Sequence, residues 1–189
     1  MTSRRLWAML PPGRTATEYA HTAREAEQQG LEGVFSIQLG SSPWVPLGAA
    51  AVSTSRLRLA TGIALAFTRS PLETATTALD LDHLTQGRFT LGLGTSVRWW
   101  HEDLYGVAYD RPVARLAEAT RIIKLVLSGQ ARKRGRFDGE FWQLWNAGRS
   151  GRPASADVGS IRFDVPAARP LRADARAAYE RRIAELFAG

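Results

Sequence analysis

Two short segments of this sequence carry residue types that suit contact with a flat or anionic ligand. The first segment is Ala66, Phe67 and Thr68, which joins an apolar run to a capped helical stretch with little room for a loop. A small residue before a bulky aromatic one suits a bulge that presses backbone against a planar ring. The residues alone favour a simpler alternative, a tight turn in which Phe67 plugs the core.

The second segment is Gly92, Leu93, Gly94 and Thr95, at the end of the next apolar run. Such glycines can expose backbone N–H groups to an anion or to a ring carbonyl. The spacing is not a dinucleotide fingerprint, because the first glycine lies inside the run and no third glycine opens a helix. A turn without any ligand remains the alternative for this segment.

Aromatic side chains and a histidine follow the same runs. Trp44, Trp99 and Trp100 lie in segments that come after predicted strands, and His101 adjoins the last of them. Exposed tryptophans usually line a pocket or an interface, and the sequence leaves both alternatives open. No histidine–carboxylate spacing is typical of a metal site, and no serine-centred nucleophile elbow occurs. The sequence therefore predicts no metal and names no catalytic residue.

A repeat of apolar runs and amphipathic stretches must position these residues. The runs cover residues 6–10, 33–37, 57–65 and 88–93, and they recur at the length of one β/α unit. Strands separated by helices run parallel, either in a closed barrel or in an open layered sheet. Both architectures bind ligands in the loops after the strands. A closed barrel of eight units needs about 250 residues, so the four visible units account for only half of one.

Helix signals fill the intervals between the runs. Thr15 and Glu18 have the spacing of a capping box, and the helix that they begin is predicted to run to residue 29. An alanine-rich helix is expected over residues 46–54. Ser70 is the expected N-cap of a helix that continues to residue 85, with Pro71 at its first position.

After the fourth run come a loop, a helix and a hairpin. The loop spans residues 95–110, and loops of this length in compact domains are usually functional or disordered. Its tryptophans and histidine are not a disordered composition. A helix is predicted over residues 112–127, and a hairpin around an Asp-Gly turn over residues 137–141.

The pattern stops after residue 144. Residues 158–165 are the best candidate for a fifth parallel strand, although Gly, Arg and Asp interrupt them, and a helical pattern resumes only over residues 174–187. The sequence therefore predicts two domains. The first is a half-barrel over residues 1–144, and the second is an irregular, arginine-rich tail with a terminal helix over residues 145–189.

Composition narrows the class of protein. The chain has no cysteine and no apolar run near the roughly 18 residues of a membrane span, so it is predicted to work in the cytoplasm and away from membranes. Its net charge is +7, and residues 130–189 hold 12 Lys/Arg against 7 Asp/Glu. No aromatic-studded basic stripe accompanies this excess, so nucleic-acid binding is not expected.

Several segments together resemble the luciferase-like monooxygenase superfamily, in particular its branch that uses the deazaflavin coenzyme F420. The residues that carry the resemblance are 33–36, 57–63, 67–71, 86–95, 111–116 and 139–141. The resemblance covers about residues 5–144. It implies a partial TIM (β/α)8 barrel of about four parallel units, followed by the hairpin and the irregular tail.

The resemblance also implies a cofactor and a site. Coenzyme F420, or alternatively FMN, would lie in the mouth of the barrel and carry out hydride transfer or oxygen activation on a small-molecule substrate. A non-proline cis peptide of the family maps to Ala66–Phe67. The residues expected near the cofactor are Gln38, Ala66, Phe67, Thr68, Gly94 and Thr95, and those expected at the substrate are Trp44, Trp99, Trp100 and His101. Gln38 stands where many relatives have a histidine or an acid, and glutamine is no acid or base at neutral pH.

The missing second half leaves two hypotheses. One is an oxidoreductase, truncated in its coding sequence, that works alone or with a partner chain completing the barrel. The other is a non-catalytic half-barrel that associates with itself or with a full-length relative. Half of a closed sheet leaves unpaired edges and an uncovered face, so a homo-oligomer or a completing partner is expected.

Overall fold

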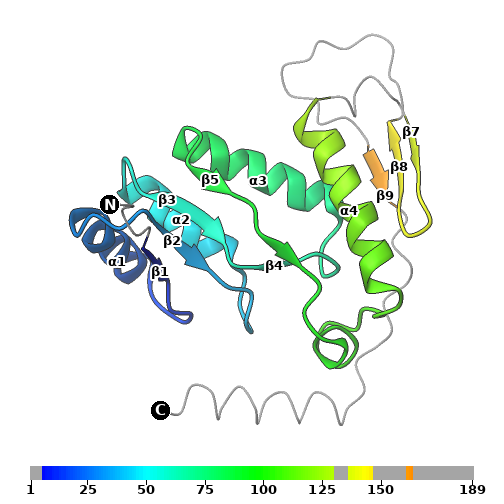
Figure 1. Cartoon of the computed structure of the whole chain (residues 1–189), viewed down its shortest axis with the longest axis horizontal. Helices are drawn as coiled ribbons and strands as arrows, with labels where there is room; N and C mark the ends of the chain where they lie inside the picture. Colours follow the sequence, from blue (N-terminus) through cyan, green and yellow to red (C-terminus); the bar gives the residue numbers. More distant parts are fainter. Residues whose placement is uncertain (1–5, 130–135, 147–160, 164–189) are drawn as a thin grey trace, which may run out of the picture. The chain divides into compact units, whose positions relative to one another are not determined.

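The computed structural model describes residues 6–129, 136–146 and 161–163 (Figure 1). The chain divides into two compact units. Unit 1 comprises Met1–Leu65 and Thr77–Gly94, and unit 2 comprises Ala66–Thr76 and Thr95–Gly189. Unit 1 therefore holds the predicted strand repeat, whereas unit 2 gathers the segment after the third predicted strand and everything after the fourth.

Unit 1 is built on a parallel sheet. Its strands are, in spatial order, β1 (Trp7–Met9), β2 (Gly33–Ser36), β3 (Arg58–Thr61) and β5 (Phe89–Thr90). Helix α1 (Ala16–Gln28) connects β1 to β2, and α2 (Trp44–Ser53) connects β2 to β3. A helix between two neighbouring strands returns the chain to the same end of the sheet, so the strands run parallel. The predicted α/β fold of parallel β/α units is confirmed.

Two of the predicted strands are each divided into two. Residues 57–65 form β3 and β4 (Ala64–Leu65), and residues 88–93 form β5 and β6 (Leu93–Gly94); β4 and β6 pair in parallel. Between the two halves, the Thr61 hydroxyl donates to the Gly92 carbonyl oxygen at 2.7 Å and accepts from the Gly92 N–H at 2.8 Å. At this break, the Thr61 side chain therefore makes the two hydrogen bonds that backbone groups would make in a continuous strand pair.

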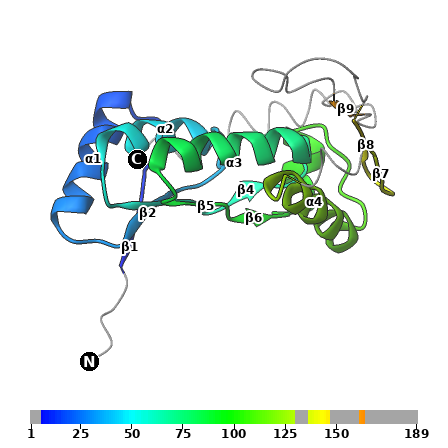
Figure 2. The ribbon, with the colours of Figure 1, turned by 90° about the horizontal axis from the view of Figure 1, so that it is seen from above.

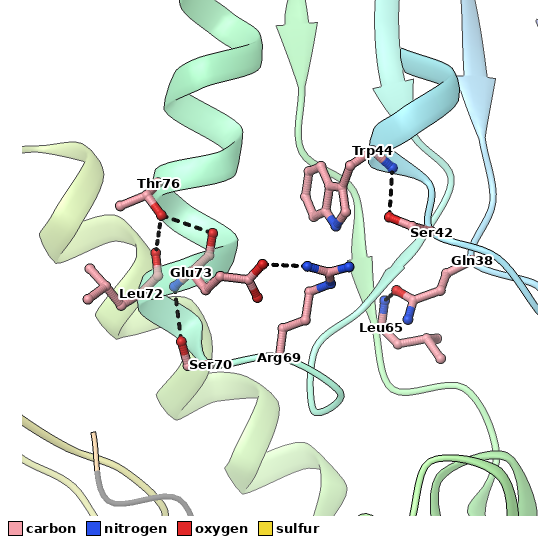
Figure 3. A network of polar contacts seen from close by, with 9 residues as sticks. All are labelled: Gln38, Ser42, Trp44, Leu65, Arg69, Ser70, Leu72, Glu73 and Thr76. Carbon is pink, nitrogen blue, oxygen red and sulfur yellow. Dashed lines mark hydrogen bonds and ion pairs between the residues drawn. The ribbon is translucent and has the colours of Figure 1, made fainter. Parts of the chain in front are cut away.

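The predicted helix caps are present. The Thr15 N–H donates to the Glu18 carboxylate at 2.7 Å, and the Glu18 N–H donates to the Thr15 hydroxyl at 3.3 Å, which completes the capping box of α1. Helix α3 (Pro71–Thr85) begins in unit 2 and ends in unit 1. The Ser70 hydroxyl accepts from the Glu73 N–H at 3.0 Å at its start (Figure 3).

One face of the sheet in unit 1 is covered. The register aligns Ala8, Val34, Leu59 and Phe89 across the four strands, and these side chains pack against the apolar residues of α1 and α2. Figure 2 shows both helices on this side of β1 and β2. The core of unit 1 therefore lies between this sheet face and the two helices.

Among the described residues of unit 1, no helix covers the opposite face, which is called the open face below. Its alternate side chains line a hollow of about 540 Å³, which includes Trp7, Phe35, Ala60 and Thr90. Met9 shares this face by register and is 44% exposed. The side chains of β3 alternate between the core and the open hollow, so this apolar run is not buried on both faces.

Unit 2 contains helices and an antiparallel sheet. The predicted loop over residues 95–110 includes a short π-helix, η1 (Trp100–Leu104), and α4 (Pro112–Leu127) follows it. Strands β7 (Arg136–Asp138) and β8 (Gln143–Asn146) pair antiparallel and form the expected hairpin. Its turn is closed by the Gly139 N–H, which donates to the Trp142 carbonyl oxygen at 3.0 Å.

The candidate for a fifth parallel strand has another role. Within residues 158–165, the described strand β9 (Ile161–Phe163) pairs antiparallel with β8 and does not extend the parallel sheet. The predicted terminal helix over residues 174–187 lies outside the described residues. The domain boundary predicted after residue 144 falls within β8 and stays a prediction.

No helix in the described part of the chain combines the length and the apolar composition needed to cross a bilayer. No cluster of three or more His, Asp or Glu side chains in these residues is arranged to hold a metal ion.

Candidate functional site

The carboxyl ends of neighbouring strands meet in unit 1. The Gln38 N–H, just beyond β2, donates to the Ile63 carbonyl oxygen at 3.1 Å. The Gln38 Oε1 atom accepts from the Leu65 N–H at 2.9 Å (Figure 3). These bonds hold the segment after β2 against the segment that joins β3 to β4. Ligands of parallel α/β proteins bind at the carboxyl ends of the strands, so this is where the sheet of unit 1 can present a site.

Two glycines let the backbone approach closely at the same place. A Cβ atom on Gly94 would collide with the Ile63 side chain, and one on Gly92 would collide with the Thr61 carbonyl oxygen. Glycine within a strand commonly marks such a close approach. Ile63 itself is 36% exposed, so an apolar and partly exposed side chain lies directly over bare backbone.

The cis peptide is at a different position from the one expected. It joins Gly62 to Ile63, whereas the resemblance was mapped to Ala66–Phe67. The error follows from the strand boundary, because the predicted strand over residues 57–65 placed its end four residues too late. The true β3 ends at Thr61.

Ala66 and Phe67 are buried in unit 2, at 2% and 4% exposure. The Phe67 ring lies 5.2 Å from the His101 ring and 6.4 Å from the Trp142 ring, measured between ring centroids. Tyr109 also packs against Phe67, at 6.2 Å. Phe67 is therefore the centre of an aromatic cluster, which agrees with the simpler alternative of a core plug.

Thr95 holds two members of this cluster. Its hydroxyl accepts from the Tyr109 hydroxyl at 3.2 Å, and its carbonyl oxygen is hydrogen-bonded to the His101 Nε2 atom. Because a carbonyl oxygen only accepts, Nε2 must carry the imidazole proton. The other ring nitrogen, Nδ1, is buried and has no partner among the described residues.

Burial keeps His101 neutral. The side chain is fully buried, and the loss of hydration lowers its pKa below the ordinary histidine value. The Thr95 hydrogen bond and the Glu102 carboxylate oppose this decrease, and the Arg115 cation adds to it. At neutral pH, the imidazole therefore presents Nδ1 as an uncharged acceptor.

Arg115 is a buried cation beside the same ring. Its guanidinium lies over the Phe67 ring at 4.8 Å and over the Trp142 ring at 5.2 Å, measured to the centroids. It donates to the Ala108 carbonyl oxygen, and its distance to the Asp110 carboxylate is 3.7 Å. Burial lowers the Arg115 pKa, and Asp110 partly offsets that effect. An arginine with so high a starting value stays charged.

Glu118 fixes the hairpin to α4. Its carboxylate accepts from three successive backbone N–H groups, those of Glu140, Phe141 and Trp142, at 2.8, 2.9 and 2.8 Å. The side chain is 2% exposed, so these donors replace its hydration. This anchoring places Phe141 and Trp142 beside Phe67 and Arg115 in unit 2.

These residues surround a cavity in unit 2 of about 550 Å³. It is lined by residues 67–70, residues 105–108 with Asp110, residues 140–142, and Arg115 of α4. Its volume falls within the range of small-molecule sites. Thr68, predicted beside the cofactor, lies on its wall.

The predicted site residues are divided between the two units. Gln38 and Gly94 belong to unit 1, and Ala66, Phe67, Thr68 and Thr95 belong to unit 2. Trp44 is a core residue of unit 1, 7% exposed and packed against Phe89. Trp99 and Trp100 lie edge to face in unit 2, at 41% and 9% exposure. Neither of the two hollows described above is lined by Trp44, Trp99, Trp100 or His101.

Sequence reasoning missed Arg115 and Glu118 as site residues, although a signal was present. The buried side chains of α4 follow the helical period over Arg115, Glu118, Ala119, Ile122 and Ile123. Two charged residues on an otherwise apolar stripe are rarely buried unless they are paired. Reading that stripe residue by residue would have marked both positions.

Comparisons with known proteins assign this chain to a family. Residues 1–180 match the family described as luciferase-like monooxygenase. A Mycobacterium tuberculosis protein named "Putative coenzyme F420-dependent oxidoreductase Rv3520c" is 36% identical over 121 residues, which are 64% of this chain and 34% of that protein. The chain spans about a third of the length of the curated relatives that it matches.

Solved structures share the fold at low identity. The monooxygenase RslO1 from Streptomyces bottropensis is similar with a TM-score of 0.62 at 24% identity, covering 72% of this chain and 44% of that one. The oxygenating constituent of 3,6-diketocamphane monooxygenase from Pseudomonas putida, solved with FMN, gives 0.59 at 18% identity, covering 74% and 42%. These likenesses support the partial TIM-barrel fold.

Proposed function

The chain belongs to the luciferase-like monooxygenase family, and from this membership we propose that it acts as an oxidoreductase with a bound deazaflavin or flavin. The proposed cofactor is coenzyme F420, with FMN as the alternative, and the reaction acts on a small-molecule substrate. The F420 preference rests on the relative in Mycobacterium tuberculosis whose name includes that coenzyme. Hydride transfer is the chemistry that F420 supplies when bound, and oxygen activation is what FMN supplies.

One observation carries the proposal: Gln38, Ile63 and Gly94 converge at the carboxyl ends of the strands in unit 1. Hydrogen bonds to the Ile63 carbonyl and the Leu65 N–H fix Gln38 there. The Ile63 side chain lies over Gly94. A partly exposed apolar side chain over bare backbone suits one face of a planar ring, so the residues fit a tricyclic cofactor. The proposed roles of this chain's residues are to seat the ring and to orient its edge beside Gln38.

The other residues predicted near the cofactor, Ala66, Phe67, Thr68 and Thr95, belong to unit 2, and their contact with the cofactor stays a prediction. The Tyr109 hydroxyl and the His101 imidazole hold Thr95 in place. Both threonines are partly buried, so their positions are set by packing.

Cofactor titration tests the proposal. F420 and FMN are added separately to the purified chain while the fluorescence of each cofactor is followed. We expect saturable binding of F420 with a dissociation constant in the micromolar range and weaker binding of FMN. Absence of binding by both at tens of micromolar would contradict the oxidoreductase function.

A pair of glycine variants makes this test specific. Gly94→Val places a side chain against Ile63, so we expect at least a tenfold loss of F420 affinity. Gly48→Ala is the matched control, because a Cβ atom there meets nothing within 4 Å. Equal F420 affinity of the two variants would show that the ring does not bind at Gly94.

A second candidate function is self-association without catalysis, and the open face of unit 1 favours it. Trp7, Phe35 and Ala60 line a hollow on that face. The edge strands β1 and β5 each have one pairing partner among the described residues. We propose that a second copy of this chain covers the face, since a closed barrel needs about eight β/α units and this chain shows half of them.

Solution mass tests the second candidate. Light scattering of the wild-type chain is expected to give a dimer. Phe35→Glu puts a charge on the open face and is expected to give a monomer, whereas Val52→Glu, at a position 75% exposed on α2, leaves the dimer intact. A wild-type monomer at micromolar concentration would remove this candidate.

A further inference from the structure

The cavity of unit 2 is not needed for the ring seat proposed in unit 1, and it contains a cation that is poorly compensated. Arg115 is 6% exposed, so it has lost most of its hydration. Its only counter-ion among the described residues is Asp110, at 3.7 Å, and that carboxylate is 63% exposed. A solvated carboxylate at this distance neutralises a buried charge weakly.

The hydrogen-bonding capacity of Arg115 is also incompletely used. A guanidinium has five N–H donors. Within the described residues, one Nη1 donor goes to the Ala108 carbonyl oxygen, and Nε is buried without any partner. Leaving a buried donor unpaired destabilises the folded protein. The Arg115 side chain therefore has unused donor capacity and lies on the wall of the cavity.

The walls of the cavity are mainly aromatic. Phe67, Phe141, Trp142 and Tyr105 line it together with Arg115. The guanidinium lies over the Phe67 ring and over the Trp142 ring, and these contacts restrict the direction of its donors. Aromatic walls favour a ligand with a flat apolar ring, and the group that binds Arg115 would be attached to that ring.

The other charged side chains on the lining have partners of their own. Arg69 is paired with Glu73, and Glu140 is paired with Arg111. Arg115 is therefore the buried charge that remains open to a ligand, with Asp110 as its weak internal competitor.

We propose that unit 2 has a binding site for a small aromatic carboxylate, whose carboxylate accepts from Arg115 and whose ring packs against Phe141 and Trp142. The arginine fork matches a carboxylate in shape and charge. About 550 Å³ accommodates a ligand of one or two rings. The site depends on unit 2 alone and does not require the cofactor proposed for unit 1.

Calorimetric titration of the full chain with benzoate tests the site. Benzamide has the same shape without the charge, and acetate has the charge without the ring. We expect benzoate to bind with a dissociation constant between about 10 µM and 1 mM, and both analogues to bind at least tenfold more weakly. Equal affinity for benzoate and benzamide, or no benzoate binding at millimolar concentration, would overturn the proposal.

Two substitutions are expected to change benzoate affinity in opposite directions. Arg115→Lys retains the charge but lacks Nε and the planar fork, and it is expected to weaken benzoate binding at least tenfold. Asp110→Asn removes the internal competitor and is expected to strengthen it several-fold. Arg121→Lys, at an exposed position of the same helix, is the matched control and should leave the affinity unchanged.

Because Arg115→Lys can also disturb packing, the Asp110→Asn variant provides an independent test of benzoate binding at Arg115. Its position is exposed, so the fold is expected to stay intact, which circular dichroism checks. Unchanged or weaker benzoate binding by Asp110→Asn would overturn the proposal whatever the arginine variant does. F420 affinity measured in parallel separates this result from the function proposed for unit 1, because neither substitution touches Gln38, Ile63 or Gly94.

Discussion

The most buried sheet positions of unit 1 are apolar side chains such as Val34 and Leu59, whereas the most buried positions of α4 in unit 2 include Arg115 and Glu118. Unit 1 meets its polar requirements through the backbone ladder, a threonine–glycine pair, and the half-buried charged side chains of Glu27 and Arg88, which bind backbone groups. In unit 2, the charged side chains that bind backbone groups, Arg115 and Glu118, are buried. A hydrophobic core loses little stability when the volume of a side chain changes slightly, whereas a buried charge that loses its partners strongly destabilises the folded state. The two units should therefore respond differently to substitution.

The largest effect is expected at Glu118. Glu118→Ala leaves three backbone N–H groups without their acceptor, and we expect a decrease in the free energy of unfolding of about 4 kcal/mol. Urea unfolding measures it. Glu25→Ala is the control, since the Glu25 carboxylate and the His21 ring that it contacts are both exposed, and exposed contacts of this kind contribute about 0–1 kcal/mol. Similar losses for the two variants would show that the buried carboxylate does not anchor the hairpin.

Leu59 tests the covered face of unit 1. It is fully buried, so Leu59→Ala is expected to decrease the free energy of unfolding by about 3 kcal/mol. Phe35→Ala, on the open face of the neighbouring strand, is expected to decrease it by about 1 kcal/mol, because that ring borders an open hollow. The same urea experiment compares them. A larger loss at Phe35 would mean that the open face is covered in solution.

The buried imidazole gives unit 2 a dependence on pH. Since burial lowers the pKa of His101, the folded state binds fewer protons than the unfolded state as pH falls below the ordinary histidine pKa of about 6.5. Stability is therefore full above about pH 6.5 and decreases below it. Unfolding midpoints at pH 7.5 and 5.5 measure the decrease. His101→Gln is expected to reduce it, and an unchanged pH dependence would assign it to other groups.

The smallest effect is expected at a helix cap of unit 1. Thr15→Ala removes the side-chain half of the capping box and is expected to lower the free energy of unfolding by about 1 kcal/mol. Thr120→Ala in α4, whose hydroxyl donates only to its own helix, is the comparison and should change stability less. Thermal unfolding of both variants is sufficient to rank them.

Much of the fold was predictable, because local patterns determine it. The capping residues Thr15 and Ser70 marked the starts of α1 and α3 within one residue. The order of apolar runs predicted parallel strands. The breaks in two of those strands were not predictable, since they depend on Thr61 bonding to Gly92, thirty-one residues away. Because the predicted strand ran past the first of these breaks, the cis peptide was expected at Ala66–Phe67, whereas it joins Gly62 to Ile63.

The candidate sites were less predictable than the fold. Gln38 and Gly94 were named from the resemblance, and the structure brings both to the Ile63–Leu65 segment. Trp44 was expected at the substrate but lies in the core of unit 1. Sequence position tells which loop a tryptophan belongs to, but not whether its ring turns toward the core or away from it.

The sequence by itself determined the kind of element at each place and the α/β family to which the elements belong, because capping residues and apolar periodicity act over a few neighbouring positions. Only the tertiary structure decided that Arg115, Phe67 and Trp142 meet around one cavity, since those contacts join α4 to two segments distant from it in the chain. Burial and the pairing of charges are properties of that assembly. No single stretch of sequence contains them.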